Sequence, residues 1–305
     1  MMPAMESLVT SLIGPIAALT AALFWALATL LYSQAGSFLS ASQLNLVKGV
    51  IACPLLLLAG WFTGQLVALE GNAATYLLLA SGVIGITLGD TLYFSALRRL
   101  GPWHTMLLEY LAPPFAALLA WILLSQGMRG YEILAALVII FGIFVVISEK
   151  PRHAERVALS ASGIAAGVGA ALCQALGLVM SFHALQEFDM NPLNAALLRL
   201  LAGTVALTIA LLVLRPSLIG TTRAALRHTS IPWLLTAIVM GTFLAIWLQQ
   251  TAIAYINPGL AQTLLATAPL WLIPIQWLRG QALSARSITG ALIAVAGISL
   301  LFGIQ

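Results

Sequence analysis

The sequence predicts an all-α integral membrane protein whose ten transmembrane helices form two inverted repeats of five. Composition is the first reason: of 305 residues, 61% are hydrophobic and only 7% are charged, with a mean hydropathy of +1.04. Such a chain has too few polar side chains to cover the surface of a soluble globule. The second reason is a series of long apolar stretches, and the third is a residue pattern that recurs in the second half of the chain.

Each apolar stretch is long enough to cross a bilayer, because a membrane-spanning helix needs roughly 20 residues. In order, the expected segments cover residues 12–34, 42–63, 73–97, 103–126, 131–148, 159–185, 192–214, 231–255, 258–278 and 284–303. The first segment is too long for the core of a signal peptide, and no basic region precedes it. We therefore expect residues 12–34 to form a retained helix.

The basic residues predict how these segments are oriented. They gather in the loops after the third, fifth, seventh and ninth segments: Arg98, Arg99, Lys150, Arg152, Arg156, Arg215, Arg223, Arg227, Arg279 and Arg286. The opposite loops hold one arginine together with four acidic residues: Arg129, Glu70, Glu132, Glu187 and Asp189. Because Lys and Arg favour the cytoplasmic side, we expect both termini outside the cytoplasm, on the periplasmic side of a bacterial inner membrane.

The recurring pattern predicts a duplication, with residues 1–150 as the first repeat and residues 151–305 as the second. The residues Gly85, Leu88, Pro102, Ala112, Pro113 and Trp121 recur as Gly241, Leu244, Pro258, Ala268, Pro269 and Trp277. Leu- and Ala-rich helices also align by chance, but chance is a weaker explanation for Pro, Trp and Gly matched at a nearly constant offset. Because each repeat has an odd number of segments, the second repeat crosses the membrane in the opposite sense to the first. Such inverted repeats are common in transporters.

Inverted repeats predict alternating access, because two similar halves can exchange conformations and expose one central site to either side. Proline in the middle of a helix removes a hydrogen bond and loosens the turn. Pro113 and Pro269 lie near the middles of the fourth and ninth segments, so we expect them to be hinges. Pro102 and Pro258 stand at the entries to the same segments and are expected to start them.

Paired motifs carry a resemblance to a known family: Gly101-Pro102 and Asn257-Pro258 at helix entries, Leu111-Ala112-Pro113 and Thr267-Ala268-Pro269 at helix centres, and glycine-rich fifth and tenth segments. This arrangement resembles the drug/metabolite transporter superfamily, EamA type. The resemblance implies a central cavity lined by helices one to four and six to nine, with helices five and ten at the periphery. Size and layout are similar to those of bacterial amino-acid exporters, including aromatic amino-acid exporters of the YddG type, which implies export of neutral or aromatic amino acids.

Four charged residues lie inside the predicted segments: Lys48, Asp90, Glu109 and Arg199. Each costs on the order of 3 kcal/mol at mid-bilayer and needs a partner or a wet cavity. Lys48, Asp90 and Glu109 lie at a similar depth, so we expect a neutralising cluster. A structural salt bridge or ordinary interfacial snorkelling is favoured over a direct substrate role. Either carboxyl group could instead carry a proton, since an apolar site favours its neutral form.

Arg199 has no acidic residue at its depth in the second repeat. Its expected partner is, in decreasing order of preference, a backbone carbonyl, an acid of the first repeat, or the carboxylate of a bound amino acid.

A substrate cavity combines apolar walls with a few orienting polar groups. The candidates for substrate binding are Trp25, Tyr32, Asn45, Tyr93, Tyr110, Gln174, Arg199, Trp247, Gln249 and Gln262. Aromatic and amide groups suit a neutral or zwitterionic organic molecule. The expected partners are therefore a small-molecule substrate and the lipid bilayer, with no nucleic acid, cofactor or metal; the sequence leaves open whether the protein is a monomer or an oligomer.

The sequence favours transport of neutral metabolites over other functions. An exchanger of phosphorylated metabolites or nucleotide sugars should gather several basic residues in its cavity, and only Lys48 and Arg199 are available. Thr87-Leu88-Gly89-Asp90 partly resembles the G-x-G-D segment of intramembrane aspartyl proteases, but the other aspartate, Asp189, is expected in a loop, so a catalytic dyad is not expected. A membrane scaffold would show no solute flux.

Overall fold

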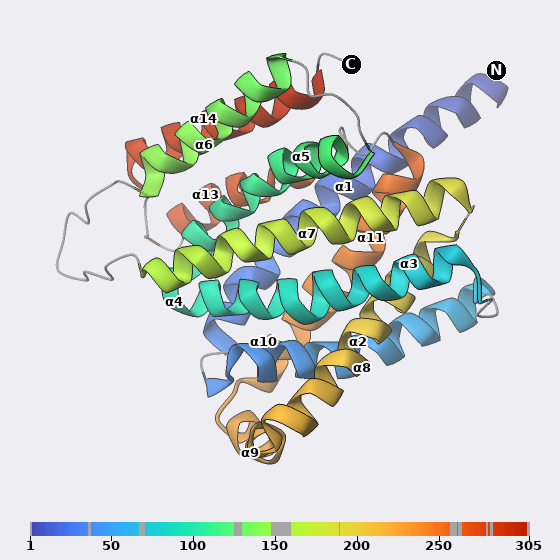
Figure 1. Ribbon diagram of the computed structural model, residues 1–305, viewed down its shortest axis with the longest axis vertical. Coiled ribbons are helices and arrows are strands. Elements are labelled where there is room, and N and C mark those ends of the chain that lie inside the picture. The colour runs from blue at the N-terminus through green and yellow to red at the C-terminus, as the bar shows by residue number, and fades with distance from the viewer. Residues whose placement is uncertain are drawn as a thin grey trace.

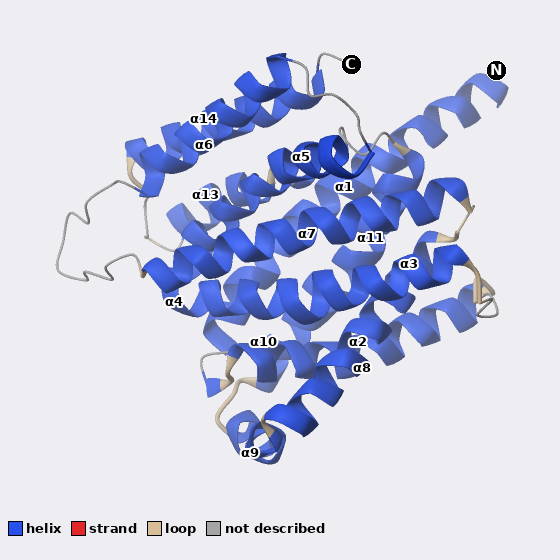
Figure 2. Ribbon diagram, in the orientation of Figure 1, coloured by secondary structure: helices blue, strands red, loops and turns tan. Residues whose placement is uncertain are grey.

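The computed structural model describes residues 2–35, 38–66, 71–124, 130–147, 160–188, 190–256, 261, 264–278, 280 and 283–303. Figure 2 shows helices joined by short loops and turns, with no strand in these residues. The prediction of an all-α chain is therefore confirmed for the part of the chain that the structure describes.

The helices of the first half are α1 (Met2–Ala35), α2 (Ala41–Thr63), α3 (Ala73–Gly82), the π-helix η2 (Val83–Asp90), α4 (Thr91–Leu108), the 3₁₀ turn η3 (Glu109–Leu111), α5 (Ala112–Leu124) and α6 (Gly130–Ile147). Those of the second half are α7 (Ala161–Glu187), α8 (Pro192–Leu214), α9 (Pro216–Arg227), α10 (Ile231–Ile238), the π-helix η4 (Val239–Leu244), α11 (Ala245–Tyr255), α13 (Ala268–Leu278) and α14 (Ala285–Gly303). Most of them run roughly along a common direction in Figure 1.

Six helical stretches among the described residues are long and apolar enough to cross a membrane. One of them, Ala73–Ala116, combines two predicted segments, 73–97 and 103–126. Gly101 separates these two, because its φ of 76° and ψ of 173° interrupt the helix in a conformation that glycine adopts without steric cost. Pro102 follows at the start of the next helical run. Shorter apolar helices at Ile133–Val146, Ala268–Leu278 and Ala285–Leu300 overlap the predicted fifth, ninth and tenth segments.

Two π-helices occupy matching places in the two halves, and the sequence analysis did not predict them. η2 contains Gly85 and η4 contains its counterpart Gly241. A π-helix widens the turn, and such segments are rare and often found at functional sites. In both halves the widened turn connects two α-helical pieces of one membrane-crossing stretch, α3 with α4 and α10 with α11.

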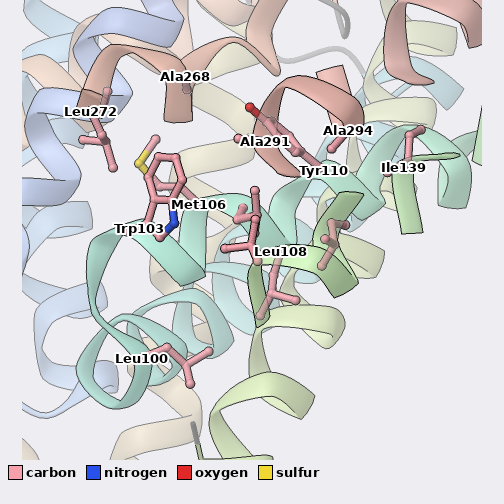
Figure 3. Close-up of a cluster of buried hydrophobic side chains, with 14 of the residues drawn as sticks. Leu100, Trp103, Met106, Leu108, Tyr110, Ile139, Ala268, Leu272, Ala291 and Ala294 are labelled. Atoms are coloured by element: carbon pink, nitrogen blue, oxygen red, sulfur yellow. The ribbon is translucent and has the colours of Figure 1, made fainter. Parts of the chain in front are cut away.

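Helices α6 and α14 form a pair beside the other helices, at one side of the molecule in Figure 1. Small residues bring their backbones together: a methyl group added at Gly142 would lie 2.6 Å from the backbone of Gly290 and of Ala294. A hydrophobic cluster then joins the pair to α4, with Trp103, Met106 and Leu108 of α4 on one side and Ala291 and Ala294 of α14 on the other (Figure 3).

The basic connection after α8 contains a helix, α9, where the sequence analysis expected a loop. No residue of α9 is fully buried, and Arg223 and Arg227 are exposed. Its apolar side rests on the bundle through Leu218 and Ile219, and Gln43 Nε2 of α2 donates a 2.9 Å hydrogen bond to the carbonyl of Leu218. α9 is therefore a surface helix that leaves its basic side chains outside the bundle.

Candidate functional site

A cavity of about 110 Å³ lies between the two halves of the molecule. A single water needs roughly 10–15 Å³ of such space, so the cavity holds several waters or part of a small organic molecule. Its described lining includes nine residues that the sequence analysis singled out: Trp25, Asp90, Glu109, Tyr110, Pro113, Gln174, Arg199, Gln249 and Pro269. These residues come from both halves, so the cavity is central, as the family resemblance implied.

The remaining sequence-predicted residues lie elsewhere. Tyr32, Asn45, Lys48, Tyr93 and Trp247 are described but are not part of the cavity lining. Gln262 lies outside the described residues. Most of these side chains were candidates because they are polar or aromatic and lie in predicted membrane segments, and that alone does not tell which side of a helix faces a cavity.

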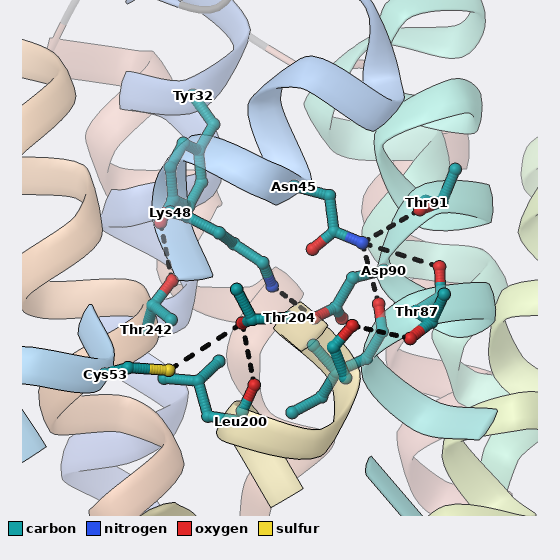
Figure 4. Close-up of polar contacts among 12 residues, drawn as sticks. Tyr32, Asn45, Lys48, Cys53, Thr87, Asp90, Thr91, Leu200, Thr204 and Thr242 are labelled. Atoms are coloured by element: carbon teal, nitrogen blue, oxygen red, sulfur yellow. Dashed lines mark hydrogen bonds and ion pairs between the residues drawn. The ribbon is translucent and has the colours of Figure 1, made fainter. Parts of the chain in front are cut away.

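Tyr32 and Asn45 bind the two π-helices instead. Tyr32 and Thr242 of η4 share a 2.7 Å hydrogen bond between their hydroxyl groups. Asn45 Nδ2 donates to the carbonyl of Ile86 inside η2 at 2.7 Å and to Thr91 Oγ1 at 2.8 Å (Figure 4). Both side chains thus hold a widened turn in place.

Lys48 and Asp90 form a buried ion pair between α2 and the end of η2 (Figure 4). Lys48 has no exposed surface, and its Nζ lies 5.2 Å from the centre of the Phe94 ring, a favourable cation–π distance. Asp90 also lines the cavity. The predicted cluster of three charges is therefore divided, because Glu109 is bonded to a different residue.

Glu109 stands in the 3₁₀ turn η3 and lines the cavity. Trp25 Nε1 donates a 3.0 Å hydrogen bond to Glu109 Oε2. The Trp25 ring packs against the Tyr93 ring with centroids 5.2 Å apart, and the Tyr93 and Thr29 hydroxyl groups share a 2.7 Å hydrogen bond. This chain of contacts fixes the orientation of one carboxylate oxygen of Glu109.

Arg199 also lines the cavity and is only 2% exposed. Its Nε and Nη1 atoms are buried, and within the described part of the chain neither has a hydrogen-bond partner. The structure thus places neither a backbone carbonyl nor an acid of the first half on these two nitrogens, although those partners were preferred in the sequence analysis. A buried charged donor without a partner is costly, because it has lost its water and gained nothing in return.

Glycines make room for Arg199, and the sequence analysis missed this role. A methyl group added at Gly85 or Gly177 would lie 3.3 Å or 3.5 Å from Arg199 Nη2. At Gly82 an added methyl group would overlap the backbone carbonyl of Arg199 itself. Gly85 belongs to the repeated pattern, so its recurrence was a usable signal, whereas no pattern marked Gly82 or Gly177.

Pro113 and Pro269 were expected near the middles of their helices, but they stand in the first turns of α5 and α13, just after an interruption. The 3₁₀ turn η3 ends at Leu111, two residues before Pro113. In the second half a turn at residues 266–267 precedes Pro269, and Thr267 Oγ1 donates to the carbonyl of Leu264 at 2.6 Å. The helices on either side of the cavity are therefore both irregular at the level of the cavity.

Comparisons with known proteins agree with this architecture. The model of the EamA-like transporter family matches the chain twice, over residues 12–148 and 161–303. A curated uncharacterized protein from Pseudomonas aeruginosa is 32% identical over 143 residues, which cover 47% of this chain and 48% of the relative, so the match spans about half the length of that relative. A solved crystal structure is similar with a TM-score of 0.63 at 18% identity, covering 97% of each chain, and this likeness concerns the fold alone.

Proposed function

Because the chain belongs to the EamA-like transporter family and is a multi-pass membrane transporter, we propose that it exports small zwitterionic metabolites through the central cavity. Neutral amino acids, including aromatic ones, are the proposed substrates. The observation that carries this proposal is the cavity itself, with apolar walls and a few charged and amide groups from both halves.

Alternating access is the proposed mechanism. Two repeats of five membrane-spanning helices, inverted with respect to each other, would exchange conformations around the cavity. Three features support it: the π-helices at matching places, the helix interruptions before Pro113 and Pro269, and the position of these two prolines in the cavity wall. Pro113 and Pro269 are the proposed hinges.

The charges of the cavity favour a zwitterion over a phosphorylated anion. Its described lining contains three charged residues, Asp90, Glu109 and Arg199. Asp90 is already paired with Lys48, which leaves one acid and one base. Trp25, Met106, Leu178 and Ile246 form part of the apolar wall, where an amino-acid side chain can be buried.

Reconstitution tests this function. The purified full-length protein is placed in liposomes loaded with radiolabelled amino acids, and efflux is measured with and without a pH gradient, beside protein-free liposomes. We expect efflux of at least one neutral amino acid. Exchange of phosphate esters without any amino-acid flux would overturn the substrate class. A flux that does not depend on the gradient would argue against proton coupling through Glu109 or Asp90.

A matched pair of variants tests whether the cavity is the route. Ile246 lines the cavity, whereas Ile209 on α8 is 56% exposed on the outside of the bundle. We expect Ile246→Trp to reduce efflux at least tenfold and Ile209→Trp to leave it near the wild-type rate. Equal rates for the two variants would contradict a route through this cavity.

A further inference from the structure

We propose that Arg199 and Glu109 bind the two charged ends of one substrate molecule, the guanidinium holding a carboxylate and the Glu109 carboxylate holding an ammonium group. This inference rests on the proposed function and makes it specific: it assigns each end of a zwitterion to a residue. Both residues line the same cavity, Arg199 from α8 and Glu109 from η3.

Arg199 has the properties of an anion site. Nε and Nη1 are buried and make no hydrogen bond with any residue that the structure describes. None of the ion pairs among the described residues involves its guanidinium. A planar guanidinium matches a carboxylate through parallel hydrogen bonds, which are stronger than those between neutral groups. A bound carboxylate would therefore compensate the charge of Arg199 and accept the hydrogen bonds that Nε and Nη1 do not make with the surrounding described residues.

The backbone around Arg199 is built to hold this side chain in position. The α8 backbone touches α3 at Gly82, and Thr87 Oγ1 of η2 donates a 2.7 Å hydrogen bond to the carbonyl of Gly203 on the next turn of α8. Gly85 and Gly177 leave space beside Nη2 that any larger residue would reduce. Such tight packing restricts the motion of the guanidinium. A side chain that is already restricted loses little conformational entropy when it binds a ligand.

Glu109 is the acid available for the ammonium end. The other acid of the cavity, Asp90, is paired with Lys48, whereas the bond that Glu109 accepts comes from the neutral indole of Trp25. That bond occupies Oε2, whereas Oε1 accepts no hydrogen bond from the described residues.

The two residues belong to different halves of the chain, so a substrate bound to both would link the halves. In the proposed mechanism, contacts to both halves would differ between the two conformations of the transporter. Only such a difference in contacts allows a ligand to shift the equilibrium between conformations. A molecule lacking either charged group would hold only one half. We therefore expect the carboxylate and the ammonium group to be required together, not merely to add affinity.

Three related compounds separate the two contacts: tryptophan, tryptamine, which lacks the carboxylate, and indole-3-propionate, which lacks the ammonium group. A second set, leucine with isopentylamine and 4-methylpentanoate, covers an aliphatic substrate. Inhibition of labelled amino-acid efflux by each compound is measured for the wild type and for Arg199→Gln and Glu109→Gln. Arg223→Gln is the matched control, because Arg223 is exposed on α9.

For the wild type we expect the amino acid to inhibit at least ten times more strongly than either truncated analogue. Arg199→Gln should weaken inhibition by the amino acid and the carboxylate analogue about tenfold, which is a loss of about 1.4 kcal/mol, and leave the amine unchanged. Glu109→Gln should weaken inhibition by the amino acid and by the amine, and it should leave inhibition by the carboxylate analogue unchanged. Arg223→Gln should behave as the wild type.

Several results would overturn the assignment. If Arg199→Gln weakened inhibition by all three compounds equally, the role of Arg199 would be structural. If it weakened inhibition by none of them, the guanidinium would not bind substrate. A wild-type protein that transported amino acids but did not distinguish them from the truncated analogues would reject this inference and leave the proposed function standing. A wild type that carried only phosphate esters would reject both.

A second measurement does not depend on transport. In detergent without substrate, Arg199→Gln should unfold at the wild-type temperature or above it, since it removes an uncompensated buried charge. A lower unfolding temperature than that of Arg223→Gln would show that Arg199 stabilises the fold, and would contradict a site kept for a ligand.

Discussion

At the scale of single residues, Lys48 and Asp90 show how a charge is tolerated far from water. Lys48 is entirely buried, and its ion pair with Asp90 lies beside the Phe94 ring. Neighbouring polar groups make hydrogen bonds as well: Asn45 Nδ2 donates to the Ile86 carbonyl, and Cys53 Sγ donates to Thr204 Oγ1 at 3.7 Å (Figure 4). Arg199, a few residues along α8 from Thr204, lacks such compensation.

We expect the loss of one partner of the ion pair to be far more harmful than the loss of both. Lys48→Met leaves Asp90 uncompensated and should lower the free energy of unfolding by about 3–5 kcal/mol, whereas Lys48→Met combined with Asp90→Leu should recover most of this loss. Unfolding in a detergent and denaturant titration measures both. Arg223→Met on the surface is the control, with a change within about 0.5 kcal/mol. A double variant as unstable as the single one would contradict a simple ion pair.

At the scale of elements, glycines decide how closely the helices approach each other around the cavity. A methyl group at Gly203 would lie 2.6 Å from Ile86 Cβ and 2.7 Å from the carbonyl of Gly82, so α8 packs directly against α3 and η2. Gly142, Gly290 and Gly297 do the same for α6 and α14. Contacts between helices in lipid depend on such packing, because apolar side chains gain nothing by leaving the hydrocarbon.

Gly203→Ala should destabilise the protein although alanine favours a helix. The methyl group cannot be accommodated without moving η2 or α8, and overpacking of this kind costs about 1–3 kcal/mol. Gly220→Ala on α9 is the matched control, because nothing lies within 4 Å of the added methyl group. That variant should be as stable as the wild type or gain up to about 1 kcal/mol. Thermal unfolding of both in the same detergent makes the comparison, and a Gly203→Ala protein as stable as Gly220→Ala would refute the close contact.

At the scale of the whole molecule, the arrangement of helices agrees with one orientation in the membrane. The Met2 end of α1 and the Gly303 end of α14 lie toward the same side of the molecule, and α9 lies away from it (Figure 1). α9 exposes Arg223 and Arg227, which favour the cytoplasmic face. The proposed orientation therefore has the termini in the periplasm of a bacterium and α9 at the inner surface of its inner membrane.

Thiol labelling in intact cells tests this orientation. The two native cysteines, Cys53 and Cys173, are replaced by alanine, and single cysteines are introduced at Gly71, before α3, or at Ser217, on α9; both positions are exposed. A reagent that cannot cross the inner membrane should label Gly71→Cys in intact cells and Ser217→Cys only after the cells are broken. The reverse result would invert the topology. Equal labelling of both cysteines in intact cells would also contradict it.

The sequence predicted the helices better than it predicted the site, for physical reasons. Apolar length sets where a chain can cross a bilayer, and glycine before proline marked the turn at Gly101. Depth along the helices correctly predicted that Lys48 lies near Asp90. It also predicted Glu109 in the same cluster, but Glu109 accepts a hydrogen bond from Trp25 instead. Tyr32 and Asn45 were expected to bind the substrate, but in the structure their side chains make hydrogen bonds to the two π-helices. Hydropathy does not reveal a π-helix, because a change of one residue per turn leaves the composition unaltered.

The charges around the cavity also determine how the membrane voltage acts on the carrier. Lys48 with Asp90 and Arg199 with Glu109 sum to zero, and a bound zwitterion adds nothing to that sum. Moving one elementary charge through a potential of 100 mV changes the free energy by about 2.3 kcal/mol. If the proposed substrate moves without a coupled proton and these four side chains are ionised, we expect its export to be electroneutral, driven by its concentration inside the cell and indifferent to the electrical potential.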